Sequence, residues 1–191
     1  MSEVRTTAEL RSDARNNRDQ ILAAAQLVFR EQGANVSMKD IADAAGVGVG
    51  TLYRRFPDRG ALITAAAHCY LSALSDLAAT AERDSPTAFE ALTRLLRDCA
   101  ELRLGALAAA IEPTLHADIK AEPTLAEART AITDRLARLT TQAHTDGTLR
   151  PDVTPTDIGR LMTLQIYATP DEPYPTAINR VLDLLIDGLR P

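Results

Sequence analysis

The 191-residue sequence predicts an all-helical protein with about nine helices. Apolar residues recur at helical spacing along most of the chain, and no glycine-rich strand–turn–strand pattern interrupts them. Hydrophobic residues make up 46% of the chain, enough to build a buried core, whereas aromatic residues make up only 4%. We expect three parts: a flexible polar arm over residues 1–17, a three-helix unit over 18–60, and a helical domain over 61–191.

The N-terminal unit is predicted from helix signals that follow one another closely. A first helix from Asp19 places Ile21, Leu22, Ala25, Val28 and Phe29 on one stripe and ends at a glycine, Gly33. Ser37 is a suitable N-cap for a second helix that ends at Gly46. A third helix begins near Gly48 or Val49 and turns Leu52 and Phe56 inward. Two short helices joined by the tight turn 46–48 predict a helix-turn-helix.

The helices of the C-terminal domain are predicted from caps, prolines and apolar stripes. Asp58 caps a long helix over 59–80, and Ser85-Pro86 begins a helix that runs to about 102. A short buried helix over 105–111 ends before Pro113, and another helix covers 123–144. Thr154-Pro155 opens a helix that continues through Ile166, and a last helix covers 176–189.

The charge is distributed unevenly. The whole chain carries a formal charge of −5, which divides into +1 over residues 1–60 and −6 over residues 61–191. The acidic total therefore does not exclude a nucleic-acid partner for the N-terminal unit, although charge alone does not establish one.

Several kinds of site are not favoured. The GVGVG string follows a helix and lacks the Lys-Ser/Thr of a phosphate-binding loop. Cys69 and Cys99 have no short-spaced metal or redox motif and are expected to be reduced thiols. No catalytic constellation is visible, and a metal site is not favoured although five scattered residues are conceivable ligands: His68, Cys69, Cys99, Glu112 and His116. We therefore expect no cofactor, no metal and no enzymatic activity.

The N-terminus is polar and has no apolar signal core. No stretch approaches the roughly 20 apolar residues that a membrane span needs. We expect a soluble cytoplasmic protein with no membrane partner.

Residues 18–66 resemble the DNA-binding domain of the tetracycline-repressor (TetR) family of transcriptional regulators. The resemblance includes the leading helix with Phe29 and Gly33, the Ser-x-x-x-Ile-Ala run from Ser37, the Ala-Gly-Val turn, and Thr-Leu-Tyr-x-x-Phe from Thr51 to Phe56, followed by Leu62. This pattern is long and position-specific. It implies a regulator, expected to be a repressor, that binds near-palindromic operator DNA as a homodimer.

The resemblance assigns DNA-contacting roles to residues of the helix-turn-helix. It implies phosphate contacts for the hydroxyls of Thr51 and Tyr53 and for Arg59, and base-facing positions for Val49, Gly50 and Arg54. Because the glycines around Val49 carry few hydrogen-bonding groups, bases are read by Arg54, by a contact of Val49 with a thymine methyl, or by backbone atoms. The candidate DNA-binding residues are Arg18, Ser37, Val49, Gly50, Thr51, Tyr53, Arg54, Arg55 and Arg59.

The resemblance also implies that the later helices enclose a small-molecule site and form the dimer interface. Residues that interrupt or polarise the aliphatic stripes are candidates for an effector site: His68, Phe89, Cys99, Arg103, His116, Met162, Gln165 and Tyr167. Because those stripes carry few charges, the unknown effector is expected to be mainly apolar. Two apolar faces on the last helix suggest a four-helix interface made by Ile158, Leu161, Met162, Ile178, Val181, Leu182, Leu185 and Leu189.

Two other functions remain open from the sequence. One is a helical interaction protein that has kept the domain without binding DNA, and the other is a small all-α enzyme. Salt-dependent affinity for the DNA that flanks its own gene distinguishes a regulator from both.

Overall fold

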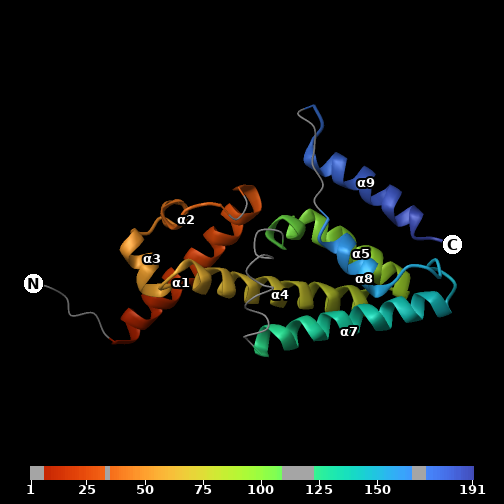
Figure 1. The fold of residues 1–191 in the computed structure, drawn as a ribbon, viewed down its shortest axis with the longest axis horizontal. Coiled ribbons are helices and arrows are strands. Elements are labelled where there is room, and N and C mark those ends of the chain that lie inside the picture. The colour runs from red at the N-terminus through yellow and green to blue at the C-terminus, as the bar shows by residue number, and fades with distance from the viewer. Residues whose placement is uncertain (1–6, 33–34, 109–122, 165–170) are drawn as a thin grey trace, which may run out of the picture.

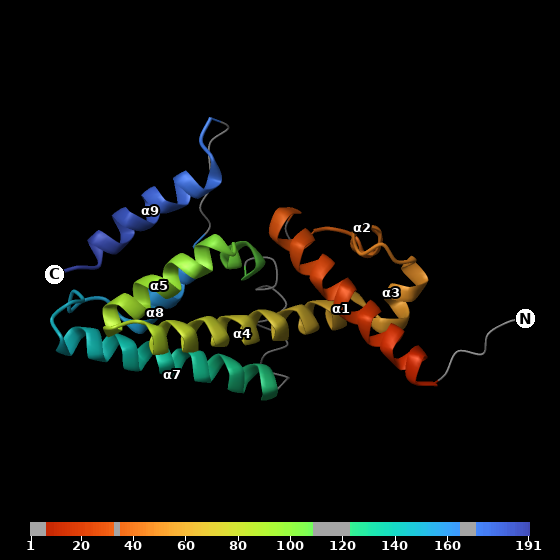
Figure 2. The same ribbon diagram turned by 180° about the vertical axis from the view of Figure 1, so that it is seen from behind.

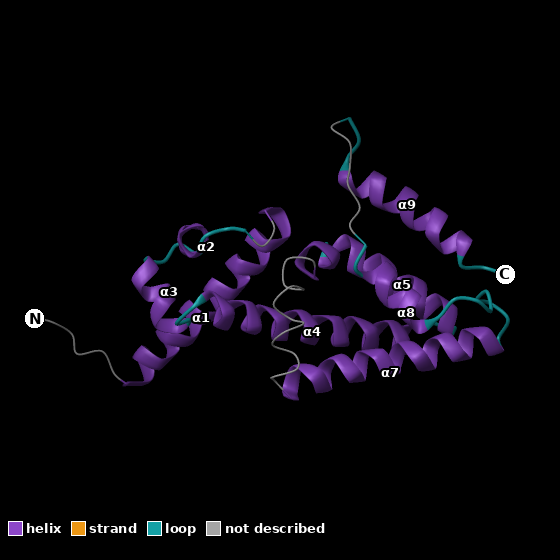
Figure 3. Ribbon diagram, in the orientation of Figure 1, coloured by secondary structure: helices purple, strands orange, loops and turns teal. Residues whose placement is uncertain are grey.

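The computed structural model describes residues 7–32, 35–108, 123–164 and 171–191, with side chains from residue 17 onward. The described residues form helices and loops only, as Figure 3 shows. Eight helices and a short helical segment over residues 104–108 agree with the predicted all-α fold of about nine helices. Gly33 and Ile166, which were expected at helix ends, lie outside the described residues.

Three helices form the N-terminal unit: α1 (Thr7–Gln32), α2 (Met38–Ala44) and α3 (Val49–Arg55). The fourth helix, α4 (Arg59–Asp84), starts beside them and continues into the rest of the molecule (Figure 1). Helix α1 begins at Thr7, within residues 1–17, which the sequence predicted as a flexible arm before a first helix from Asp19. Residues 7–18 contain good helix formers and no glycine or proline, so a helix can form there without an apolar stripe to mark it.

In the C-terminal domain, two helices pack on α4 and two more pack on those. Helix α5 (Ala88–Glu101) and helix α7 (Pro123–Thr145) both contact α4 and each other, and α8 (Pro155–Met162) contacts α5 and α7. Helix α9 (Tyr174–Gly188) contacts α5 and lies at the edge of the bundle away from α4 in both views (Figures 1 and 2). The N-terminal unit and α9 therefore lie at different ends of the molecule, with α4 and α5 between them.

Helix starts follow local capping chemistry. Ser37 caps α2 and Thr154 caps α8, each in a reciprocal box with an aspartate three residues later, and Asp58 caps α4, as predicted. One predicted cap was wrong: Thr87, not Ser85, caps α5, and its Oγ1 accepts a hydrogen bond from Glu90 N at 3.2 Å. Ser85 instead ends α4, which extends four residues beyond the predicted Thr80.

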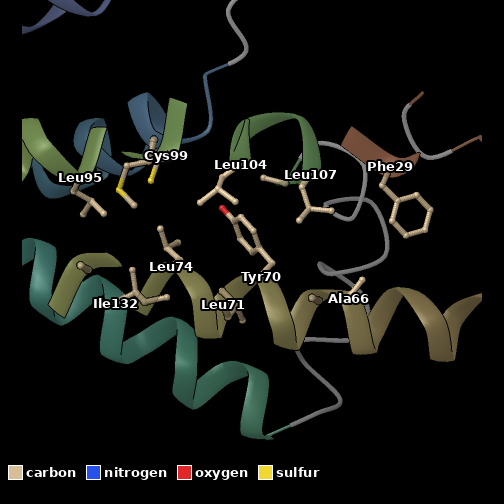
Figure 4. Packing of buried hydrophobic residues seen from close by; sticks show 14 of the residues in the cluster. Phe29, Ala66, Tyr70, Leu71, Leu74, Leu95, Cys99, Leu104, Leu107 and Ile132 are labelled. Atoms are coloured by element: carbon tan, nitrogen blue, oxygen red, sulfur yellow. The ribbon is translucent and has the colours of Figure 1, made fainter. Parts of the chain in front are cut away.

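The core of the C-terminal domain lies between α4 and the helices that cover it. Figure 4 shows Tyr70 and Leu74 of α4 facing Cys99 of α5 and Leu104 and Leu107 of the segment that follows. These five side chains are all buried. The core is almost entirely apolar: among the described residues, Thr140 is the single buried polar residue, and its Oγ1 has no hydrogen-bond partner.

Helix α4 is long and apolar enough to cross a membrane by length and composition, with a window of mean hydropathy 1.3, although no such stretch was predicted from the sequence. A core helix meets the same criterion. The buried face of α4 packs against α1, α5 and α7, which explains its apolar character without a membrane.

Candidate DNA-binding interface

The angle between α2 and α3 is fixed by a tight turn and a small apolar core. Gly46 has a φ of +64°, a left-handed conformation that favours glycine. Val47 N then donates to Ala42 O at 3.0 Å. Ile41, Ala42 and Leu52 are fully buried where the two helices meet. This local construction confirms the helix-turn-helix that the sequence predicted.

The turn is also held from α1. The Nε2 atom of Gln20 donates to the carbonyl of Ala45, the C-cap of α2, at 2.8 Å. Gln20 was not among the sequence-based candidates. Its place one residue before the apolar stripe of α1 gave no signal, because the contact depends on how α1 crosses the turn.

The outer face of α3 carries the hydrogen-bonding groups expected of a recognition helix. Tyr53 is 47% exposed, and Gly50, Arg54 and Arg55 are also exposed, while Thr51 and Val49 are half-buried. Arg54 folds back along the helix, and its Nη2 donates to Thr51 Oγ1 at 2.8 Å. The hydroxyl of Thr51, the phenol of Tyr53 and the guanidiniums of Arg54 and Arg55 therefore lie within one or two turns of the same helix.

Three other candidates make contacts inside the protein. The hydroxyl of Ser37 donates to Asp40 Oδ2 at 2.6 Å and accepts from Asp40 N at 3.1 Å, so it serves the cap of α2. The guanidinium of Arg18 lies 5.3 Å from the centroid of the Phe56 ring. The guanidinium of Arg59 lies 5.8 Å from the centroid of the Phe29 ring and donates to the carbonyl of Val36.

Acidic groups near this surface are occupied within the protein. Asp43 pairs with Lys39 at 2.7 Å, and Asp58 Oδ1 accepts from Ala61 N at 2.8 Å. The hydrogen bond from the Ser37 hydroxyl, followed by that from the Ser37 amide, lowers the pKa of Asp40 below its ordinary value. Helix α3 itself contains two arginines in its last turn and no acidic residue. Its outer face therefore carries two cationic side chains and no carboxylate.

The five described candidates for the effector site differ in burial. Phe89, Cys99 and Met162 are buried in the core, His68 is half-buried on α4, and Arg103 is exposed. His116, Gln165 and Tyr167 lie outside the described residues. Burial raises the pKa of the Cys99 thiol to about 12, so this group is an apolar core residue at neutral pH.

Most of the candidate dimer residues are already covered by their own chain. Ile158, Met162, Ile178, Leu182 and Leu189 are buried, and Leu161, Val181 and Leu185 are half-buried. The five buried residues therefore pack within their own chain, where α8 and α9 both contact α5. The sequence assigned the longer apolar stripe of α9 to the partner, and in the single chain Ile178 and Leu182 of that stripe are buried.

Helix α9 has a different exposed face. Its residues line an open groove of about 510 Å³: Thr176, Asn179, Arg180, Asp183, Leu184 and Asp187. Leu184, which the sequence placed off the main stripe, is 65% exposed, more than any other large hydrophobic residue among those described.

The described residues contain no cluster of candidate metal ligands. Within the described ranges, no three His, Cys, Asp or Glu side chains are close enough to hold a metal ion. Glu112 and His116 lie outside those ranges.

Comparison with known proteins identifies the family. Residues 21–66 match the family model described as bacterial regulatory proteins of the tetR family, and residues 85–191 match the C-terminal domain of SbtR-like transcriptional regulators. An HTH-type transcriptional regulator of Staphylococcus aureus (strain USA300) is 42% identical over 69 residues, which are 36% of this chain and 34% of that protein. The match therefore spans about a third of the length of this curated relative.

Two solved structures are similar over nearly the whole chain. A TetR transcription regulatory protein from Mycobacterium vanbaalenii is 31% identical with a TM-score of 0.63, and the alignment covers 95% of this chain and 99% of that one. A TetR transcriptional regulator from Streptomyces coelicolor is 35% identical with a TM-score of 0.59, covering 91% and 98%. The chain therefore belongs to the TetR family of bacterial transcriptional regulators.

Proposed function

We propose that this protein is a ligand-responsive transcriptional repressor that binds a near-palindromic operator as a homodimer and acts in the cytoplasm. The observation that supports this proposal most directly is the outer face of α3. Tyr53, Arg54 and Arg55 are exposed there, on a helix held by a buried helix-turn-helix core. Such a face fits the major groove, with hydroxyls and guanidiniums in reach of phosphates and base edges.

Selection from a pool of random DNA duplexes tests the DNA-binding part of this proposal. The expected result is enrichment of a sequence with two inverted half-sites centred one helical turn apart, about 34–36 Å. A second pool, selected with the Tyr53→Ala, Arg54→Ala double variant, serves as the control and should show no enrichment. Failure of the wild-type protein to enrich any sequence would contradict the proposal.

We further infer that the dimer forms through the outer face of α9. This face combines exposed Leu184 with charges of both signs, since Arg180 lies one turn before Leu184 and Asp187 lies one turn after it. In an antiparallel pair of such helices, Arg180 of each copy approaches Asp187 of the other, while the two Leu184 side chains meet near the axis. The face is therefore self-complementary, as a two-fold interface requires.

Light scattering of two charged variants tests the interface. Leu184→Glu should convert the dimer to a monomer at micromolar concentration, because it buries two unpaired carboxylates at the axis. Leu27→Glu is a matched control, since Leu27 is a 47% exposed leucine of α1 that lies away from α9. A Leu184→Glu variant that remains dimeric would exclude this face.

We propose that the effector is a mainly apolar organic molecule that binds beside α4 and α5. The side chains between these helices support this, since Tyr70, Leu74, Leu104 and Leu107 are buried there and carry no charge (Figure 4). Titration with the fluorescent dye anilinonaphthalene sulfonate, an apolar ring system that carries one sulfonate, tests it with and without the selected duplex. The dye should bind more weakly when DNA is bound, by the same factor by which it weakens DNA. Equal dye affinities would contradict control from this region.

A further inference from the structure

Arg59 lies in the first turn of α4, but its side chain turns toward the interior of the DNA-binding unit. Its Nη1 donates to the carbonyl of Val36, and its guanidinium lies over the Phe29 ring. Phe29 is 1% exposed, and Arg59 itself is half-buried. A single side chain of α4 therefore contacts both the last turn of α1 and the segment that leads into α2.

The contact with Val36 leads directly to the recognition helix. Val36 precedes Ser37, the N-cap of α2, whose box with Asp40 fixes where that helix begins. Helix α2 then packs on α3 through the turn at Gly46. A change in the direction of the first turn of α4 is therefore passed to α2 and α3 through a hydrogen bond and a stacked ring.

Arg30, the residue after Phe29 in α1, connects α1 to the C-terminal domain. Arg30 Nη1 donates to Leu102 O at 3.1 Å, across 72 residues of sequence, while its Nε donates to Gln26 O at 3.3 Å within α1. Leu102 is the C-cap of α5. The last turn of α1 is thus held by α4 through Phe29 and by α5 through Arg30.

The α5 end of this connection is itself constrained. Arg103 has a φ of +52°, a left-handed conformation that L side chains rarely adopt, and no other described non-glycine residue has a positive φ. Its guanidinium lies 4.8 Å from the centroid of the Tyr174 ring, at the start of α9. Tyr174 also donates its hydroxyl to Ala100 O at 3.4 Å. The turn at 102–103 therefore joins α1, α5 and α9.

We propose that the last turn of α1 is the joint through which the C-terminal helices position the recognition helix, with Arg59 as a positioning residue rather than a phosphate contact. This inference rests on the proposed DNA-binding function. It differs from the resemblance, which implies that the basic residue at this position contacts the DNA backbone. The guanidinium of Arg59 uses its planar shape against a carbonyl and an aromatic face, which a lysine ammonium does not reproduce.

Substitution of Arg59 by lysine separates the two roles. A phosphate contact needs a positive charge, so it predicts that Arg59→Lys binds DNA as the wild type does, while Arg59→Gln reduces the salt slope by about one. A positioning residue predicts that both variants lower affinity for the selected duplex by about tenfold. It also predicts an unchanged salt slope and affinity for a random duplex within about twofold. Arg55→Gln is the matched control for a phosphate contact, with weaker binding to both duplexes and a reduced slope.

Hydrogen exchange supplies a readout that does not depend on DNA. In Arg59→Lys and in Arg30→Gln, the amides of Asp40 and Ile41 at the start of α2 should exchange about tenfold faster, because the connection that holds this segment is lost. Amides of α7 should keep their wild-type rates, which shows that the variants remain folded. Arg190→Gln, which removes a guanidinium 4.9 Å from the centroid of the Phe89 ring at the opposite end of the molecule, should leave the α2 amides unchanged.

The outcomes are distinct. Wild-type-like binding and exchange in Arg59→Lys, together with a lower salt slope in Arg59→Gln, would contradict the proposed joint. Arg59 would then be assigned to a phosphate contact. Unchanged exchange at Asp40 and Ile41 in folded Arg59→Lys would overturn it as well. Absence of wild-type binding to any selected duplex would instead contradict the proposed function, and the exchange experiment would still decide whether the joint exists.

Discussion

The contacts inside the DNA-binding unit join residues that are close in the sequence. The contacts inside the C-terminal domain join residues that are far apart in the sequence. In the first, Gln20 reaches Ala45 across 25 residues and Arg59 reaches Val36 across 23. In the second, Arg97 pairs with Asp183 across 86 residues at 2.7 Å, and Arg135 donates to Ser75 O across 60 at 3.2 Å. A short continuous segment therefore defines the surface of the first unit, whereas the surfaces of the second depend on how distant helices meet.

Gly105→Ala should have the largest effect and should act on the C-terminal domain. A Cβ at this position would lie 2.6 Å from Thr163 O and 2.7 Å from Leu164 O, which are backbone atoms at the end of α8. Since neither atom can move without shifting a helix, we expect a loss of about 3 kcal/mol in the free energy of unfolding. Urea unfolding followed by circular dichroism measures it. Gly188→Ala is the control, because nothing lies near its added Cβ; equal stabilities of the two variants would contradict the close approach.

Arg54→Ala should have the next largest effect and should act on DNA binding alone. If Arg54 reads a base, its loss costs roughly 1–3 kcal/mol at one base pair of each half-site and flattens the preference there. Arg55→Ala should instead weaken selected and random duplexes alike. Repeating the duplex selection with each variant makes the measurement. A preference that Arg54→Ala leaves unchanged would assign base reading to Val49 or to backbone atoms.

The two capping boxes allow the same chemistry to be compared in the two regions. Ser37 N donates to Asp40 Oδ2 and Thr154 N donates to Asp157 Oδ2, both at 3.0 Å. Replacement of either hydroxyl residue by alanine should cost about 1 kcal/mol of stability. Ser37→Ala should also weaken binding to the selected duplex, while Thr154→Ala should not. Equal effects of both variants on DNA affinity would remove the distinction between the regions.

The pH dependence of these two variants follows from the aspartates. Hydrogen bonds from Ser37 lower the pKa of Asp40, and those from Thr154 lower the pKa of Asp157. A carboxyl whose pKa is lower in the folded state stabilises the protein above its unfolded pKa, and this contribution is lost as the pH falls through the folded pKa. The stability difference between wild type and each variant should therefore be constant from neutral pH to about pH 5 and shrink below about pH 4. A difference that grows toward acid would contradict this assignment.

Much of the DNA-binding unit was predictable because its signals are local. The cap at Ser37, the glycine at the turn and the burial of Leu52 follow from residue type and spacing. The contacts of Arg59 were not, since they depend on the crossing of α4 over the end of α1.

The C-terminal domain shows the same limit more strongly. Its helices were predicted from periodicity, but an apolar stripe does not say which neighbour covers it. Ile178 and Leu182, which were predicted at the dimer interface, are buried within their own chain. Leu184, which the sequence placed off the main stripe, is exposed beside charged residues. The start of α1 at Thr7 was missed because residues 7–18 have no apolar stripe to mark a helix.

The smallest expected effect is on the rates at which the two cysteines are alkylated. These rates measure how often the C-terminal core opens and do not require a change in its packing. Cys99 is 1% exposed and its thiol pKa is about 12, so almost no thiolate is present at pH 8, whereas Cys69 is only partly buried on α4. Iodoacetamide should therefore modify Cys69 first, and Cys99 should react only when α5 separates from α4. Mass spectrometry of timed samples measures both rates, and mild urea should accelerate the modification of Cys99 selectively.

Gly105→Ala should raise the rate at Cys99 because it loosens the contact between residues 104–108 and α8. Ser37→Ala should leave this rate unchanged because α2 lies outside that core. If Ser37→Ala accelerated Cys99 as much as Gly105→Ala did, the two regions would open as a single cooperative unit.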